Sequence, residues 1–240
     1  MVEDPLNIDV YSNYITLLQK IDDILKRVGR DSSELSIVGV TKRIELERIT
    51  PAIDAGLKII GEIIGTEFKK KFHQLREYSP QTKFHAVGKL QSNKVKFAVE
   101  NCDLIQSIQT EKILSLVNKR AQNLNRIYPI FLQTDFSEIA EPKGLNLKSV
   151  QKFIATIEDL SHIQIHGIMT IAPLEYEVDK TKLRRFFKRT FKIFREVIAP
   201  SLNIERPQLS MGMSNDFEIA LEEGSTMIRV GTAIFGPRMK

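Results

Sequence analysis

Two short runs of small residues near the C-terminus have the chemistry of an anion site. Ser210-Met-Gly-Met-Ser214 follows one apolar, strand-like run, and Gly231-Thr232 follows the next. Such turns free backbone N–H groups and add hydroxyl donors, and a helix that starts beside them favours negative charge. Arg229 precedes the second turn and could face the ring of a molecule that carries a phosphate. The pattern predicts a phosphate site, with two ordinary surface loops as the alternative.

A lysine closes a much earlier apolar run and could supply a nucleophile. Lys42 directly follows Ser36–Thr41. Lysines that are desolvated near other cations attack aldehydes as neutral amines. The alternative is a lysine whose ammonium extends into solvent. An amine and a phosphate site within one ligand's length suggest a phosphorylated aldehyde, and pyridoxal 5′-phosphate (PLP) is the commonest cofactor of that description.

The elements that must position these residues alternate along the chain from residue 36 onward. Apolar β-branched runs predict strands over 36–41, 57–60, 84–87, 104–105, 127–133, 163–169, 208–210 and 226–230. Amphipathic runs predict helices over 43–55, 66–78, 93–99, 110–124, 149–160, 180–198 and 217–223. Thr50-Pro51 indicates a restart in the first of these helices, and Thr110 a helix cap.

Strands joined through helices must be parallel with right-handed crossovers. The eight repeating units predict a single (β/α)8 TIM barrel over residues 1–240, with an extra helix over 6–28 packed outside. Catalytic groups of this fold gather at the carboxyl ends of the strands. Lys42, Glu62, Gln106-Ser107, Gln133-Thr134-Asp135, Met169-Thr170 and the two C-terminal turns all fall there, and His85 leads into the end of its strand.

Composition narrows the setting. The formal charge of +5 is modest, and the densest cationic run, Lys69–Lys71, reads as a solvated helix face. Cys102 is the one cysteine, so no intrachain disulfide can form, which suits a reducing cytoplasm. The N-terminus has no signal-peptide pattern and no apolar run is long enough to span a membrane. We expect a cytoplasmic protein that binds neither membranes nor nucleic acid and has no metal site.

Several motifs together resemble one known family. They are Val40-Thr-Lys42, Gly61-Glu62, Phe84-His-Ala-Val-Gly-Lys-Leu-Gln-Ser-Asn-Lys94, Ile105-Gln-Ser107, Gly167-Ile-Met169 and Leu209–Gly236. The chain is similar over nearly its whole length to the PLP homeostasis proteins of the YggS/PROSC type. These look like the barrel domain of alanine racemase without its C-terminal β-domain, so the resemblance implies a TIM barrel of the alanine racemase N-terminal type.

By that resemblance Lys42 would hold PLP as a Schiff base, and Arg229 would contact the pyridine nitrogen. The resemblance implies that the phosphate is held by Met213, Ser214, Gly231 and Thr232. His85 and Met169 would lie near the ring, although both could equally be structural. Ile63 stands where the family usually has asparagine, which removes one polar ligand.

The resemblance implies a carrier that buffers PLP in vitamin B6 homeostasis, with PLP-dependent apoenzymes as acceptors and with no robust catalysis. A monomer is expected. The alternative is a weak PLP-dependent amino-acid racemase or related enzyme, in which His85 or Lys89 supplies the second acid/base. A nucleic-acid-binding module that uses the basic helix at 180–195 rests on charge alone, and apolar residues give that helix a buried face.

Overall fold

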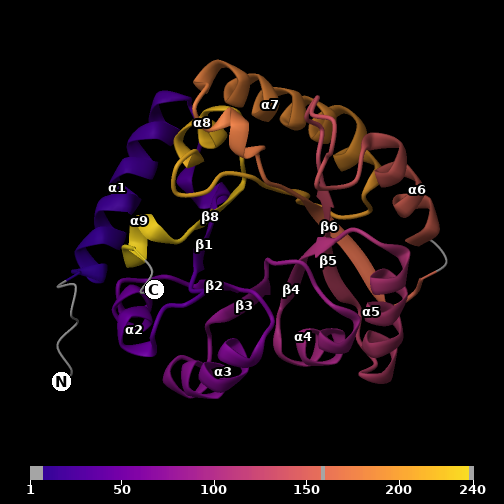
Figure 1. Ribbon diagram of the computed structural model, residues 1–240, viewed down its shortest axis with the longest axis horizontal. Helices are drawn as coiled ribbons and strands as arrows, with labels where there is room; N and C mark the ends of the chain where they lie inside the picture. The colour runs from indigo at the N-terminus through magenta and orange to yellow at the C-terminus, as the bar shows by residue number, and fades with distance from the viewer. Residues whose placement is uncertain (1–7, 158–159, 238–240) are drawn as a thin grey trace.

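Eight parallel strands close into a barrel in their order along the chain. In the computed structural model, which describes residues 8–157 and 160–237, each strand pairs with the next and β1 pairs with β8 (Figure 1). The strands are β1 (Ser36–Val40), β2 (Ile59–Glu62), β3 (Lys83–Ala86), β4 (Leu104–Ile108), β5 (Tyr128–Thr134), β6 (Ile163–Thr170), β7 (Gln208–Ser210) and β8 (Met227–Val230). The predicted TIM barrel is confirmed.

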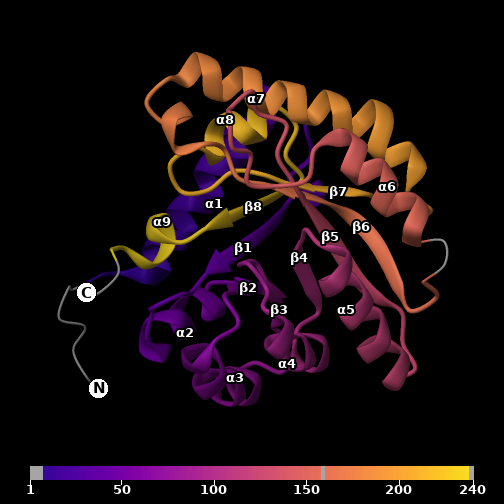
Figure 2. The same ribbon diagram turned by 45° about the vertical axis from the view of Figure 1, so that its right-hand side comes forward.

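Helices surround this barrel and cross between its strands. They are α1 (Val10–Arg27), α2 (Leu46–Asp54), α3 (Thr66–Tyr78), α4 (Val95–Asn101), α5 (Glu111–Asn123), α6 (Leu147–Ile157), α7 (Lys180–Ile193), α8 (Phe217–Glu222) and α9 (Thr232–Phe235). The predicted extra helix, α1, lies beside α8 and α9 on the outside of the barrel (Figures 1 and 2). Asn13 of α1 donates to the Ile234 carbonyl at 3.2 Å, which ties the two ends of the chain together.

Local sequence signals explain where several helices begin. The Thr110 hydroxyl accepts a hydrogen bond from the Ile113 amide at 3.4 Å, as its predicted capping role requires. Asp179 caps α7 by accepting from the Thr181 and Lys182 amides at 3.0 Å. These acceptors satisfy amide groups that have no partner inside a helix.

Some predicted boundaries were wrong. The chain does not restart a helix at Thr50-Pro51, because α2 runs continuously through Pro51. Pro51 is the sixth residue of α2, so the helix continues through it without one amide donor to the Glu47 carbonyl. The strand predicted at 57–60 lies two residues later in β2, and Gln106 lies inside β4 instead of at its end. The second C-terminal turn continues into α9, which the small residues did not predict.

Two apolar clusters support the site from different sides. The larger cluster fills the space between the barrel and its helices, and Cys102 lies buried within it, as predicted. The smaller cluster fills the barrel interior with Val38, Leu104, Phe131, Met169 and Met227. Alternate residues of a strand face opposite sides of the barrel wall. The inward-facing side chains that come next along the strands therefore form the layer above this smaller cluster.

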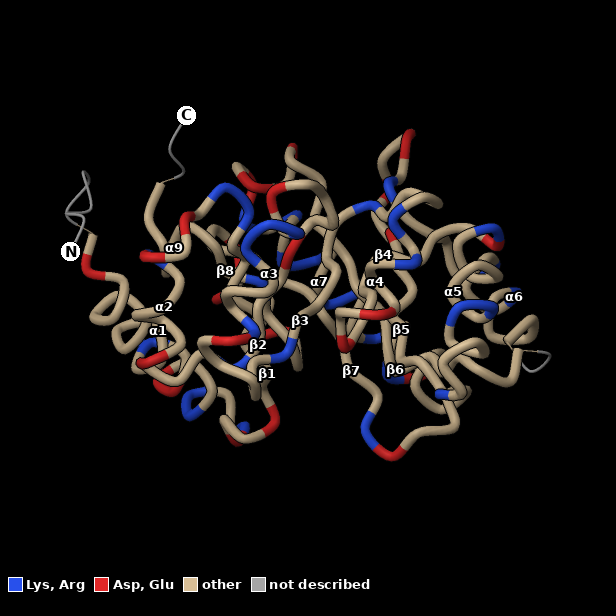
Figure 3. Tube along the Cα trace, turned by 90° about the horizontal axis from the view of Figure 1, so that it is seen from below, with Lys and Arg blue, Asp and Glu red and all other residues tan. Residues whose placement is uncertain are grey.

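Seen from below, Lys and Arg residues alternate with Asp and Glu residues along the chain trace (Figure 3). On α7, Arg184 pairs with Glu222 and Glu223, and Leu183, Phe186 and Phe187 are buried, which gives most of this basic helix a structural role. The Lys69–Lys71 run was predicted to be a solvated helix face. This prediction was wrong for Lys71, which is buried. Among the described residues, none of the helices is both long and apolar enough to cross a membrane.

Candidate active site

The turn after β7 and the turn after β8 meet at a single hydroxyl group. Ser214 Oγ accepts hydrogen bonds from the amides of Gly231 at 3.1 Å and Ala233 at 3.3 Å. The Met213 amide donates to the buried carboxylate of Asp216, which holds the first turn in shape. The two amides converge on one oxygen atom, and an oxyanion could be held by the same group of donors. We call Ser214, Gly231 and Ala233 the cradle.

Glycine relieves crowding at two points around the cradle. Gly212 has φ of 99°, and a Cβ there would lie 2.7 Å from the Cβ of Ala220. A Cβ at Gly231 would lie 3.3 Å from the carbonyl oxygen of Val40, the last residue of β1. The backbone of the cradle therefore approaches the end of the strand that leads into Lys42.

Lys42 lies in the turn that directly follows β1, as predicted. Its side chain is half-buried, and within residues 8–157 and 160–237 its ammonium group makes no hydrogen bond or ion pair. The close approach of Gly231 to Val40 brings this turn and the cradle to the same sector of the barrel end. The structure thus brings together the predicted amine and the predicted anion site.

Arg229 lies inside the barrel and organises a line of buried polar groups. It donates to Ser210 Oγ at 2.7 Å and to the Thr170 carbonyl at 2.8 Å. Ser210 Oγ in turn donates to Gln106 Oε1 at 2.8 Å, and Gln106 Nε2 lies 3.0 Å from His85 Nδ1. We call His85, Gln106, Ser210 and Arg229 the buried polar chain. Burial lowers the pKa of Arg229 to about 10, which the Asp216 carboxylate opposes, so the guanidinium stays charged at neutral pH.

The direction of the hydrogen bonds in the buried polar chain determines which nitrogen of His85 carries the proton. An amide nitrogen can only donate, so His85 Nδ1 accepts from Gln106 and the proton of the neutral ring sits on Nε2. Burial, with a smaller effect from Lys83, lowers the pKa of His85 to about 3. The ring is therefore neutral at physiological pH and its free nitrogen is a hydrogen-bond donor. The lone pair on Nδ1 is already engaged by Gln106, so in this tautomer the free nitrogen can donate a proton but cannot accept one.

The remaining predicted site residues occupy different environments. Met213 is half-buried in the first turn, and Thr232 is exposed at the start of α9. Met169 is fully buried in the interior apolar cluster, beside the strand end whose Thr170 carbonyl accepts from Arg229. Lys89, the alternative base, is exposed.

Gln106 and Asp216 have roles at the site that the sequence alone did not indicate. Gln106 connects His85 to Ser210, and its buried position follows from its place inside β4. In the sequence, Asp216 could not be distinguished from an ordinary residue at the start of the helix that follows Ser214. Ile63 is more than one-third exposed, and a Cβ at Gly88 would lie 2.5 Å from its side chain, so this isoleucine covers the end of β3.

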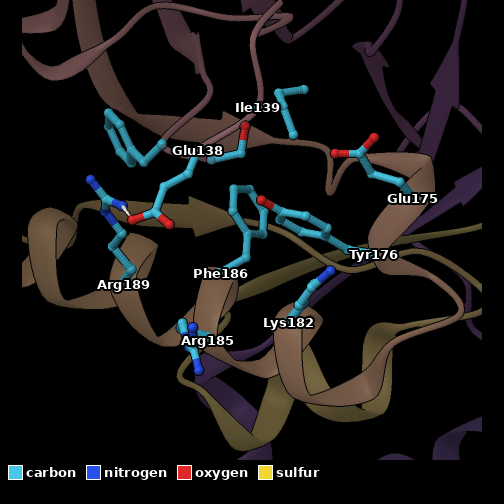
Figure 4. Close-up of a pocket in the computed structure, with 10 residues that line it drawn as sticks. Glu138, Ile139, Glu175, Tyr176, Lys182, Arg185, Phe186 and Arg189 are labelled. Carbon is cyan, nitrogen blue, oxygen red and sulfur yellow. Dashed lines mark hydrogen bonds and ion pairs between the residues drawn. The ribbon is translucent and has the colours of Figure 1, made fainter.

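Two adjoining pockets lie beyond the ends of β5 and β6. The smaller, about 300 Å³, lies between Tyr176, Phe186 and the paired side chains of Arg189 and Glu138 (Figure 4). The larger, about 500 Å³, reaches the end of β5 and shares Ile139 with the smaller pocket. Neither pocket is lined by Lys42 or by the cradle, which lie at the ends of β1, β7 and β8.

Comparison with known proteins identifies relatives over nearly the whole chain. The family model of the alanine racemase N-terminal domain matches residues 19–239. A pyridoxal phosphate homeostasis protein of Aquifex aeolicus is 30% identical over 222 residues, which cover 92% of this chain and 95% of the relative.

Solved structures give the same result. A protein of unknown function from Bifidobacterium adolescentis superposes with a TM-score of 0.87 at 28% identity, covering 98% of both chains. PipY of Synechococcus elongatus with PLP bound superposes with a TM-score of 0.77 at 30% identity, covering 90% of this chain and 100% of PipY.

Proposed function

The chain belongs to the alanine racemase N-terminal domain family, among its pyridoxal phosphate homeostasis proteins, and we propose that it binds PLP and acts in PLP homeostasis. The observation that carries the proposal is the approach of the cradle to Val40 at the end of β1, two residues before Lys42. A phosphorylated aldehyde needs an anion site and an amine within its own length. The chain offers both at one end of the barrel.

The residues of the site suit such a group. The hydroxyl of Ser214, whose oxygen accepts from the amides of Gly231 and Ala233, can donate to a phosphate oxygen, and the two amides could donate to phosphate in place of Ser214 Oγ. The absence of a side chain at Gly231 leaves the backbone open to close approach. Met213 and Thr232 belong to the same two turns. We propose that these groups hold the phosphate and that Lys42 is the amine.

When bound, PLP would supply an aldehyde that the amine of Lys42 could capture reversibly. Arg229 would face the pyridine nitrogen as a donor, since a guanidinium has no acceptor. A donor at that nitrogen keeps the ring unprotonated, which weakens its capacity to accept electrons from a substrate carbanion. This arrangement favours storage of the cofactor over amino-acid chemistry. His85 is expected near the ring as a neutral donor, and Met169 close to the ligand.

The state of His85 argues further for a carrier. A racemase needs an acid/base on each face of its substrate. His85 already accepts at Nδ1 and carries its proton on Nε2, and Lys89 is exposed. We propose that the chain functions as one PLP-binding domain over residues 1–240, as a cytoplasmic monomer that passes the cofactor to PLP-dependent apoenzymes.

Two measurements on the PLP-loaded protein separate carrier from catalyst. Incubation with an apo-aminotransferase should restore aminotransferase activity as the absorbance of the loaded protein falls. Incubation with α-deuterated alanine should leave the deuterium in place over the same time. If wild type removes the deuterium and Lys42→Ala does not, the protein is an enzyme and the carrier assignment is contradicted.

A further inference from the structure

The backbone around Lys42 is fastened by a buried cation from a neighbouring helix. We propose that Lys71 is a positioning residue, which with Glu62 and Glu67 holds the turn that presents Lys42 to its ligand. We call these three residues the ionic clamp. The proposal rests on the proposed role of Lys42, but the geometry of the turn can be tested without any ligand.

Lys71 reaches the backbone on both sides of Lys42. Its ammonium donates to the Thr41 carbonyl at 2.7 Å and to the Ile44 carbonyl at 3.1 Å. The lysine comes from the second turn of α3, far from Lys42 in sequence but close to it at the barrel end. These two carbonyl acceptors lie on either side of Lys42 in the sequence, so the position of Lys42 depends on the single ammonium group of Lys71.

The two glutamates complete the attachment. Glu62 lies 2.7 Å from Lys71 and accepts from the Thr41 hydroxyl at 2.7 Å. Glu67 lies 3.1 Å from Lys71 and accepts from the Arg43 amide at 2.7 Å. Lys42 is thus flanked on both sides by residues held by the clamp, while its own side chain is left without a polar partner among the described residues.

Such an arrangement is a poor way to gain stability alone. Lys71 is 7% exposed and Glu62 is 2% exposed, and the desolvation of two charges offsets most of their attraction. Burial raises the pKa of Glu62, although Lys71 opposes this effect. Arg43 also adopts φ of 57°, which a residue with a side chain rarely does. The ion pair adds little stability but fixes an unusual turn. We attribute its presence to the need to hold Lys42 in position within that turn.

The expected benefit is a faster capture of an aldehyde. A nucleophile held near its target reacts as though at high concentration, and a displacement of about 1 Å can cost about 100-fold in rate. Lys71→Met removes the cation and frees the carbonyls of Thr41 and Ile44. Lys70→Met is the matched control, since Lys70 is the exposed neighbour on α3.

The first test uses hydrogen exchange of the ligand-free protein. In Lys71→Met the amides of Arg43 and Ile44 should exchange at least about tenfold faster than in wild type and in Lys70→Met. Should Lys71→Met fail to fold, Glu67→Ala removes the acceptor of the Arg43 amide from a half-exposed position. Unchanged exchange in the folded variants would overturn the proposal.

The second test measures how fast PLP is fixed on Lys42. Borohydride quenching at successive times, followed by peptide mapping, should give an initial rate about tenfold or more lower in Lys71→Met, with Lys70→Met unchanged and Lys71→Arg intermediate. No adduct in wild type would contradict the proposed function itself. An adduct that forms at the same rate in wild type and in folded Lys71→Met would contradict only the role of the clamp.

Discussion

The two sides of the candidate site are built from different chemistry. On the side of β7 and β8, the cradle and Arg229 are held by backbone amides, hydroxyl groups and glycines that permit close approach. On the side of β1 and β2, the turn that carries Lys42 is held by the buried charges of Lys71 and Glu62 together with the half-exposed Glu67. We propose that the first side receives an anion and that the second positions the amine of Lys42.

The difference bears on how each side should respond to change. Neutral hydrogen bonds to a preformed backbone tolerate the loss of one partner with a modest cost. Buried charges are coupled, so the loss of one leaves another unpaired. Arg229 combines both behaviours, because it is a buried charge at the end of a line of neutral groups. It is therefore the residue whose loss should disturb the site most.

Arg229→Leu should give the largest effect on stability. It removes the donors to Ser210 Oγ and to the Thr170 carbonyl, and it leaves the buried Asp216 without its opposing charge. We expect the free energy of unfolding in urea to fall by about 3 kcal/mol. Arg189→Leu, which breaks an exposed pair with Glu138, is the control and should cost less than about 1 kcal/mol. Equal costs for the two variants would mean that the buried polar chain adds nothing to the fold.

His85 should make stability depend on pH. Its folded pKa of about 3 lies below the ordinary value of 6.5, so the unfolded chain binds a proton that the folded chain does not. The contribution of His85 is therefore complete above pH about 6.5 and is lost as the pH falls toward about 3. Between pH 7 and pH 5 wild type should lose about 2 kcal/mol more than His85→Gln. Parallel pH profiles for the two proteins would show that His85 is not held neutral.

Ser214→Ala should have the smallest effect on the fold and a selective effect on the ligand. The hydroxyl accepts from the amides of Gly231 and Ala233, and its loss leaves these partly exposed amides to water. We expect PLP affinity to fall about tenfold, or about 1.4 kcal/mol, while Kd for pyridoxal without phosphate stays unchanged. Ser201→Ala, an exposed serine in the segment before β7, is the control. A proportional loss of affinity for both ligands would place the phosphate away from the cradle.

The same contrast explains which parts of the site could be predicted. The β7–β8 side is encoded in consecutive residues, because glycine and hydroxyl residues must stand where the backbone turns, so Ser214, Gly231 and Arg229 could be found in the sequence. The β1–β2 side depends on contacts between distant segments. Lys71 looked like part of a solvated run, although its spacing from Glu67 places the two on one helix face.

The fold followed from the alternation of short apolar runs and amphipathic runs, which identifies a barrel even when boundaries shift by a few residues. The boundaries that failed depended on backbone geometry. Proline is common at the first position of a helix, but Pro51 lies inside one, so the residue type alone did not distinguish the two cases. Gln106 read as a strand-end polar residue because its buried partners Ser210 and His85 come from other strands.

The most direct test of the account is the identity of the residue that carries PLP. Wild type and Lys42→Ala, each loaded with PLP and reduced with borohydride, can be compared by absorbance and by mass spectrometry of their peptides. The account predicts one stable adduct in wild type, on the peptide that contains Lys42, and none in a Lys42→Ala protein that is folded by circular dichroism. An adduct on another lysine in wild type, or one that persists in the variant, would contradict it.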